Sequence, residues 1–396
     1  MPNGLNWKTG TTDKTETLTN GTGIDRNDLR SQSLDLLRFP LAVIIIINHT
    51  IFIPARILES QGTGSFADAM PVYSAIQNFV SSFLQGQSVP IYFFISGFVF
   101  FLGADLTKKV YVRKLKNRVH TLLIPYILWN SLDILLRLVC FLPFLAFLSP
   151  GTHSESLDFS FSAILQSYWD ASKGIFGSTA QAGFPSNIPL WFVRNLMVVV
   201  LFAPVLHWLL KKTRYGIVLL LGIFWVLSVC LHGPDRYAVA FFFFTWGGYM
   251  SVNSKEMLAE FGRFSKASII GYLVIGSSLC LISNKDFPQL WTILKTLNIL
   301  VGLFCAYNLA AWLLKNKICK VSRFLASSSF FLYVAHELIC GTILKILFHG
   351  LRPTSDAGIC FICFLAVGLT VGSLLLSFYL LKRYIPGLLT VLTGRK

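Results

Sequence analysis

Ten long runs of apolar residues dominate this 396-residue chain. A helix needs roughly 20 residues to cross about 30 Å of bilayer core, because each residue rises about 1.5 Å. Only 13% of the residues are charged, which is too few to cover the surface of a soluble protein. We therefore expect an all-α polytopic membrane protein with about ten transmembrane helices. The predicted spans are 34–54, 78–102, 119–149, 189–210, 215–231, 237–252, 267–283, 290–314, 326–348 and 358–381.

Positive charge is distributed unevenly between these runs. Short loops rich in Lys and Arg stay on the cytoplasmic side of a membrane. Of the 34 Lys and Arg residues, 24 lie in one alternate set of loops and tails and 5 in the opposite set. With an even number of spans, both termini are therefore expected in the cytosol. The basic residues are spread over several loops, which argues against a nucleic-acid partner.

The regions outside the spans differ in character. Residues 1–33 are polar and lack the apolar core of a signal peptide, so we expect a disordered cytoplasmic tail. Residues 34–381 form the predicted transmembrane domain, and 382–396 a second cytoplasmic tail. The outward loop at about 150–188 is too long for a simple connector, which suggests a lid or a substrate platform. The cysteines are not accompanied by a second pair of Cys or His residues that would complete a metal site, so no metal is expected.

Two ionisable residues share a face of the first predicted helix. Arg38 and His49 are 11 residues apart, which is close to three full turns at about 100° per residue. An ionisable group in a bilayer is costly unless it faces a cavity or a partner. One interpretation is a channel for an anionic molecule with a long neutral arm. The alternative is that Arg38 anchors the topology and His49 hydrogen-bonds a neighbouring helix.

The densest basic run precedes the third span. It covers residues 108–118 and includes Arg113, Lys116 and Arg118. Arg and Lys bind phosphates through charge-assisted hydrogen bonds, so the run is a candidate phosphate site. A role in topology alone is the simpler alternative.

Further polar groups interrupt the later spans. Arg194 follows Trp191 near the outer end of the fourth span, and it is expected to face the interior because it is costly beside lipid. His336 and Glu337 lie in the ninth span at a depth similar to that of His49. Residues 85–90 break the second span with polar backbone, which a bilayer tolerates only around a cavity or a watery path.

Five segments form a pattern that covers most of the chain: 34–49, 89–97, 118–129, 189–194 and 329–336. In this order they resemble the membrane-bound acyltransferase 3 family, integral-membrane enzymes that O-acylate bacterial surface glycans. The first segment carries that family's Arg-x10-His arrangement, from Arg38 to His49. The resemblance extends over about 34–381, and the chain looks like the form without a fused esterase-like domain.

The resemblance implies a bacterial inner-membrane acyltransferase. It would move an acyl group, most often acetyl, from acyl-CoA (acetyl-CoA) to a hydroxyl of a cell-surface glycan or its lipid-linked precursor. His49 would be the catalytic residue, as a base or as a transient acyl carrier, and Arg38 and Arg118 would hold the phosphates of the cofactor. Arg194 or His336 would stabilise an oxyanion, and Trp191 is a further substrate candidate.

Two positions depart from the family pattern. Thr121 stands in the second place of an Arg-x-x-Arg motif that starts at Arg118, so Arg113 and Lys116 are added as phosphate candidates. Asn195 stands where an Asp often follows the Arg of the fourth span, which removes an expected partner of Arg194. A secondary transporter or flippase of a small anionic or glycan substrate is the alternative function, because it shares the buried charges and the broken helix.

The charge distribution yields a prediction about topology. Reporter fusions after Lys116, Lys212 and Lys317 and at the C-terminus should report a cytosolic location. A fusion near Ala171 should report the outside, because only the outward loops are poor in Lys and Arg. A cytosolic signal from Ala171 would contradict the whole assignment.

Overall fold

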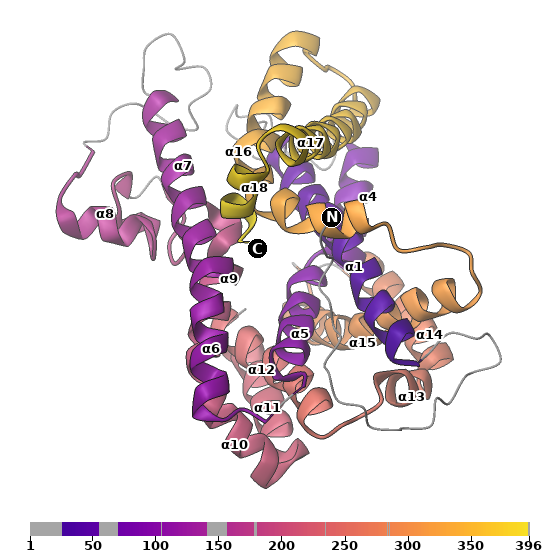
Figure 1. Cartoon of the computed structure of the whole chain (residues 1–396). Coiled ribbons are helices and arrows are strands. Elements are labelled where there is room, and N and C mark those ends of the chain that lie inside the picture. Colours follow the sequence, from indigo (N-terminus) through magenta and orange to yellow (C-terminus); the bar gives the residue numbers. More distant parts are fainter. Residues whose placement is uncertain are drawn as a thin grey trace. The chain divides into compact units, whose positions relative to one another are not determined.

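The computed structural model describes residues 26–54, 70–103, 105–140, 157–177, 180–233, 235–282, 284 and 286–394. Within these residues every regular element is helical, and none is a strand (Figure 1). The α-helices are α1 (Arg26–Ile51), α4 (Pro71–Phe79), α5 (Ser88–Phe101), α6 (Lys108–Arg118), α7 (Ile124–Cys140), α8 (Phe161–Ser167), α9 (Trp191–Leu201), α10 (Ala203–Thr213), α11 (Tyr215–His232), α12 (Arg236–Val252), α13 (Met257–Gly262), α14 (Ser265–Leu281), α15 (Pro288–Lys315), α16 (Arg323–Leu351), α17 (Asp356–Tyr384) and α18 (Pro386–Thr393). Two π turns, η1 (Val80–Leu84) and η2 (Val119–Leu123), and two 3-10 turns, η4 (Ala171–Lys173) and η6 (Ile188–Leu190), interrupt them.

Six helices in the described part of the chain are long and apolar enough to cross a membrane, or up to seven if a bent pair is one span. The bent pair is the fourth predicted span, whose halves α9 and α10 meet at an angle of 63°. The fifth and seventh predicted spans are shorter apolar helices. The first helix begins at Arg26, eight residues before the predicted start at Leu34, and residues 141–149 of the third run lie outside the described residues.

Helix starts follow ordinary local rules. Proline lies in the first turn of α4, α15 and α18, where its missing N–H leaves no hydrogen bond unmade. The α17 helix starts after Ser355, whose side-chain oxygen accepts a hydrogen bond from the Gly358 N–H at 3.2 Å. The long apolar segments between such signals continue as helices because a bilayer leaves backbone groups no other partner.

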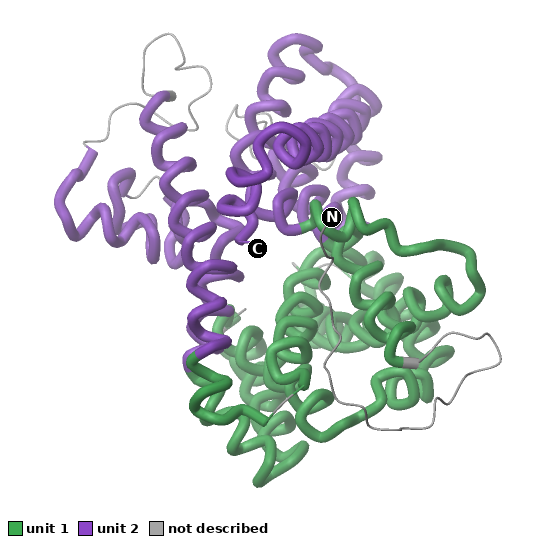
Figure 2. The backbone as a smooth tube through the Cα atoms, in the orientation of Figure 1, with its two compact units in different colours: residues 1–41, 82–112, 202–329 green, residues 42–81, 113–201, 330–396 purple. Residues whose placement is uncertain are grey.

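The chain divides into two compact units, coloured separately in Figure 2. Unit 1 contains 1–41, 82–112 and 202–329, and unit 2 contains 42–81, 113–201 and 330–396. His49, His336 and Glu337 therefore belong to unit 2, and Arg38 belongs to unit 1.

Unit 1 is built around the close packing of α5 on α12. A Cβ on Gly97 would collide with the backbone of Phe244, and one on Gly247 would collide with the backbone of Phe94. Small residues let the helix backbones approach closely, and in lipid such packing replaces the hydrophobic effect between helices.

The predicted break in the second span is present in unit 1. The chain passes from η1 to α5 through Gly86, which has a φ of +84°. After the turn, Gln87 donates to the carbonyl of Asn298 at 3.1 Å, and the Asn298 amide donates to the carbonyl of Ser82 at 2.9 Å. The second bond satisfies a backbone carbonyl of the π turn, and the break continues from the exposed Gln85 and Gly86 into the buried Gln87 and Ser88.

Hydrogen bonds between helices that are distant in sequence hold unit 2 together. The Asp356 carboxylate accepts hydrogen bonds from the N–H groups of Val72 and Tyr73 at 2.6 and 2.9 Å, which joins α17 to α4. The Trp129 indole donates to the carbonyl of Leu392 at 2.9 Å, which joins α7 to α18. These contacts link segments that are distant in sequence around the helices that carry the histidines.

The close helix crossing in unit 1 yields a prediction about stability. Gly97→Ala should lower the free energy of unfolding by about 1–3 kcal/mol, because the added methyl meets backbone atoms that cannot move independently. Thermal unfolding of the detergent-purified protein, followed by tryptophan fluorescence, would measure the loss. Gly372→Ala on α17 is the matched control, since nothing lies within 4 Å of its Cβ position. Equal unfolding temperatures for the two variants would contradict the packing argument.

Candidate functional site

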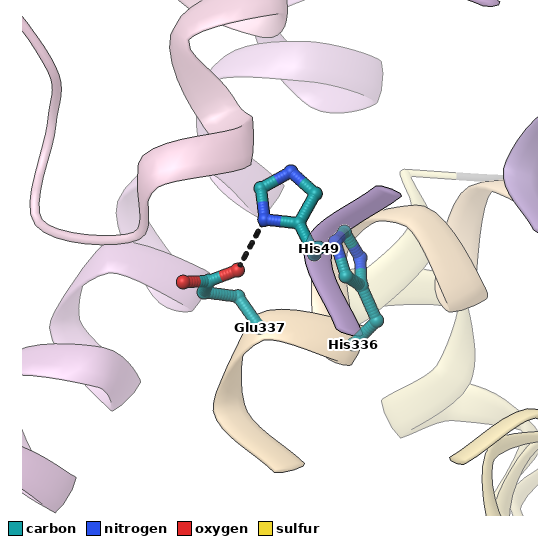
Figure 3. A group of neighbouring side chains, drawn as sticks. All are labelled: His49, His336 and Glu337. Atoms are coloured by element: carbon teal, nitrogen blue, oxygen red, sulfur yellow. Dashed lines mark ion pairs between the residues drawn. The ribbon is translucent and has the colours of Figure 1, made fainter. Parts of the chain in front are cut away.

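Three side chains from two helices of unit 2 form a cluster: His49 near the end of α1, and His336 and Glu337 in the middle of α16 (Figure 3). The His49 Nδ1 lies 2.9 Å from the Glu337 Oε2, and the two imidazole rings meet edge to face with centroids 4.9 Å apart. One ligand atom from each residue lies within 4.8 Å of the others, a donor set that could also hold a metal ion.

The cluster is largely removed from solvent. The His336 side chain is fully buried, and the side chains of His49 and Glu337 are 31% and 21% exposed. Charges in such surroundings need partners, because burial removes their hydration. The contact with Glu337 therefore helps to hold the His49 ring in place.

The α16 helix is fixed against the turn that precedes α9. The Tyr333 hydroxyl donates to the carbonyl of Pro189, and the Asn187 amide donates to the carbonyl of Val334 at 3.1 Å. The backbone N–H of Asn187 donates in turn to the side chain of Asn130 on α7, at 3.0 Å. These bonds hold the position of α16 just before His336.

An ion pair on α7 lies in the same unit. Arg137 contacts Asp133 at 2.8 Å, and the Ser186 hydroxyl donates to the same carboxylate oxygen at 2.6 Å. Unit 2 therefore contains a second, largely buried pair of opposite charges besides the contact of His49 with Glu337.

Arg194 is almost fully buried and points at the outer segment. Its guanidinium donates to the carbonyl of Trp169 and, at 3.2 Å, to the carbonyl of Gly183, and it lies 5.0 Å from the centroid of the Trp169 ring. The Arg194 Nε donates to the Asn195 Oδ1 at 3.1 Å. The expectation that Asn195 removes an internal partner is therefore wrong, because an amide oxygen accepts from a guanidinium as a carboxylate does.

The described part of the outward loop is ordered by its own polar contacts. The Asp170 carboxylate accepts from the Ser172 hydroxyl at 2.7 Å and from the Gly183 N–H at 2.8 Å. Desolvation raises the pKa of Asp170, but these hydrogen bonds and the charge of Lys173 outweigh it, so the pKa lies below its ordinary value. The carboxylate therefore stabilises the turn above the ordinary carboxyl pKa, and this contribution is lost as the pH falls through the lowered value.

The predicted phosphate ligands lie on two helices. Arg38 on α1 contacts Asp35 at 3.1 Å, and its carbonyl accepts from the Tyr92 hydroxyl at 2.5 Å. Arg113, Lys116 and Arg118 lie on the last turns of α6 in unit 2, directly before η2, with Arg113 and Lys116 exposed and Arg118 half-buried. Cofactor binding by these residues stays a prediction.

The remaining predicted residue, Trp191, opens α9 directly after η6 and is half-buried. It follows the turn whose Pro189 carbonyl accepts from Tyr333.

One member of the cluster was noted in the sequence without a role. Glu337 stands beside His336 in an apolar helix, and an ionisable residue at that depth is a functional candidate by itself. The sequence did not indicate that its partner would be His49, because the helix-to-helix contact joins residues far apart in the chain.

Comparison with known proteins agrees with the resemblance seen in the sequence. The family model of an acyltransferase domain matches residues 31–378. The chain belongs to the acyltransferase 3 family. It is also 23% identical over 312 residues to the succinoglycan biosynthesis protein ExoH of Rhizobium meliloti (strain 1021), which covers 78% of this chain and 79% of ExoH. No solved structure matches it.

The family and the helices together establish the general class. The chain is an acyltransferase, and its several long apolar helices make it a multi-pass membrane protein. The cluster of His49, His336 and Glu337 lies within the matched region and carries groups suited to acyl transfer, an imidazole beside a carboxylate.

The contacts of Arg194 yield a prediction about the outward loop. Arg194→Met should loosen the described segment around Trp169 and Gly183, because it removes two charge-assisted hydrogen bonds worth about 1.5–3 kcal/mol each. Limited trypsin digestion should then cut after Lys173 about tenfold faster or more than in the wild type. Arg352→Met, which changes an exposed arginine, is the control and should leave the rate unchanged. An unchanged rate in the Arg194 variant would show that other contacts hold the loop.

Proposed function

We propose that this acyltransferase moves an acyl group, most often acetyl, from acyl-CoA to a hydroxyl of a cell-surface glycan or of its lipid-linked precursor. The observation that carries the proposal is the contact of the His49 Nδ1 with the Glu337 carboxylate at 2.9 Å. An imidazole paired in this way resembles the base of a hydrolase triad, in which the carboxylate fixes the tautomer and stabilises the imidazolium. ExoH, the relative named above, is a succinoglycan biosynthesis protein, which favours a polysaccharide acceptor.

The chemistry follows from that pairing. With the Nδ1–H directed at Glu337, the His49 Nε2 keeps a lone pair that can take the proton of the acceptor hydroxyl. The hydroxyl oxygen then attacks the thioester carbonyl, the carbon–sulfur bond breaks, and the thiolate leaves and takes up the proton from the imidazolium. Glu337 acts as a positioning residue throughout.

A second route uses the same residue differently. The His49 Nε2 attacks the thioester carbonyl, the carbon–sulfur bond breaks, and the thiolate leaves while the acyl group stays on the ring nitrogen. The hydroxyl oxygen then attacks the acyl carbon, the carbon–nitrogen bond breaks, and the hydroxyl proton is taken up by the thiolate. In this route Glu337 again compensates the charge that develops on the ring. Both routes need His49, so its role does not depend on the choice between them.

The donor is expected on the cytosolic side. We propose that Arg38, Arg113, Lys116 and Arg118 bind the phosphates of coenzyme A, because Arg and Lys make strong charge-assisted hydrogen bonds to phosphate. Any phosphate at Arg38 competes with Asp35, which now holds that guanidinium. His49 follows Arg38 by three helical turns along α1, in the direction in which the thioester arm would extend.

The proposed orientation places both termini in the cytosol of a bacterium, with ten spans in its inner membrane. Each of the ten predicted runs contains a helix within the described residues, six or up to seven of them long and apolar enough to cross a membrane, and the charge difference between alternate loops supports the direction of each. The outer segment that Arg194 holds would then face the glycan, with Trp191 near its end as a candidate contact. Arg194 is also a candidate donor to the oxyanion of the transition state.

The proposal predicts a separation of binding from chemistry. His49→Ala should keep the fold and acyl-CoA binding but lose acyl transfer by at least about 10²–10⁴-fold, because it removes the general base or the acyl carrier. Purified protein in nanodiscs would be supplied with radiolabelled acetyl-CoA, and thiol release and label on the acceptor would be measured.

Two matched variants make the test specific. Arg38→Ala should instead weaken acyl-CoA binding, by about 1.5–3 kcal/mol for a lost charged hydrogen bond, and the difference should shrink at high salt. His207→Ala should behave like the wild type, since His207 is not part of the histidine cluster of unit 2. It lies in unit 1, where it stacks on Phe101. Transfer at the wild-type rate by His49→Ala would refute the catalytic assignment. Movement of a substrate across vesicles without consumption of thioester would favour a transporter.

A further inference from the structure

The hydrogen bonds of His336 fix which of its nitrogens carries a proton. Its Nδ1 lies 2.7 Å from the carbonyl oxygen of Tyr333 and 3.3 Å from that of Leu332. A carbonyl oxygen can only accept, so the Nδ1 must be the donor. In the neutral ring the Nε2 therefore carries the lone pair. This tautomer is imposed by the helix backbone itself.

Among the described residues, the other nitrogen of His336 has no hydrogen-bond partner. The side chain is 0% exposed, and its Nε2 makes no hydrogen bond. Burial favours the neutral ring, because a buried charge is costly unless it is paired. A histidine that served only the packing of α16 would be expected to have both nitrogens satisfied. The Nε2 is therefore an acceptor without a donor, next to the proposed catalytic residue.

The two histidines offer two acceptors to one ligand. Their ring centroids are 4.9 Å apart, and one nitrogen of each lies within 4.8 Å of the other and of a Glu337 oxygen. The hydroxyl that is to be acylated has one proton, which goes to His49. The same hydroxyl has no second proton for His336. A second hydroxyl is needed to donate to the His336 Nε2.

We infer that the acceptor substrate is a vicinal diol, whose reacting hydroxyl is bound by His49 and whose neighbouring hydroxyl donates a hydrogen bond to the His336 Nε2. This inference rests on the proposed function and specifies its acceptor. Adjacent hydroxyl oxygens on a sugar ring lie about as far apart as two hydrogen-bonded oxygens. Two hydrogen bonds of about 2.8 Å can therefore connect such a pair to two rings whose centroids are 4.9 Å apart.

This role differs from the oxyanion role predicted for His336 from the sequence. A neutral ring with its N–H committed to the Tyr333 and Leu332 carbonyls has nothing to donate to an oxyanion. As an acceptor it selects the substrate instead. A buried site that hydrogen-bonds a hydroxyl rejects analogues that lack it, because its own polar group is then left unpaired. An isolated primary hydroxyl should accordingly be a poor acceptor.

The test uses two small probes, trans-1,2-cyclohexanediol and cyclohexanol, with protein in nanodiscs. Saturation-transfer NMR measures their binding, with empty nanodiscs as the blank, and label transferred from radiolabelled acetyl-CoA measures reaction. The wild type should prefer the diol by about 5- to 100-fold. His336→Leu should abolish the preference by weakening the diol and leaving cyclohexanol unchanged. His336→Gln, whose amide oxygen can replace the lone pair, should retain part of it.

The outcomes separate this inference from the proposed function. Equal use of the two probes by the wild type, or an equal loss of both in His336→Leu, overturns the inference and leaves acyl transfer intact. A His336-dependent preference in binding without any transfer of acetyl supports the diol site and argues against the proposed reaction. Unchanged acyl-CoA binding by both variants shows that they are folded.

Discussion

The contact between His49 and Glu337 is the interaction on which the site in unit 2 depends. Removing either the imidazole or the carboxylate would destabilise the site, because the side chain that remains is too little hydrated for water to replace its partner. The pair therefore defines how α1 and α16 meet. The bonds from Tyr333 to the Pro189 carbonyl and from Asn187 to the Val334 carbonyl then join α16 to the turn before α9, just before His336. The proposed catalytic orientation of His49 and the packing of the two helices thus depend on the same contact.

The polar groups of unit 2 differ in how completely their hydrogen-bonding atoms are paired. The Arg194 guanidinium donates hydrogen bonds to carbonyls of the outer segment, so it orders the backbone of that segment. Arg137 pairs with Asp133 at 2.8 Å. In the histidine cluster the His336 Nε2 is buried without a hydrogen-bond partner among the described residues, as are the Asn187 Oδ1 and the Asn195 Nδ2 elsewhere in unit 2.

Much of this arrangement could be predicted from the sequence because bilayer thickness restricts helix length. The apolar runs located all the helices of the predicted spans, and the periodicity of α1 singled out Arg38 and His49. The pairing of His49 with Glu337 could not be predicted, since it depends on which faces of distant helices meet. The bend between α9 and α10 was also missed, although Pro204 in the first turn of α10 is a residue that typically starts or bends a helix. The partners of Arg194 are backbone carbonyls, which leave no signature in side-chain identity.

The end of α18 has a consequence for how unit 2 assembles. Gly394 has a φ of +64°, and a Cβ there would collide with the backbone of Thr121 in η2, the turn directly after Arg118. The neighbouring bond from Trp129 to Leu392 joins residues 263 positions apart. Closing so long a loop is slow and entropically costly, so η2 gains its packing partner late in folding. During synthesis η2 therefore lacks this packing partner until α18 has emerged.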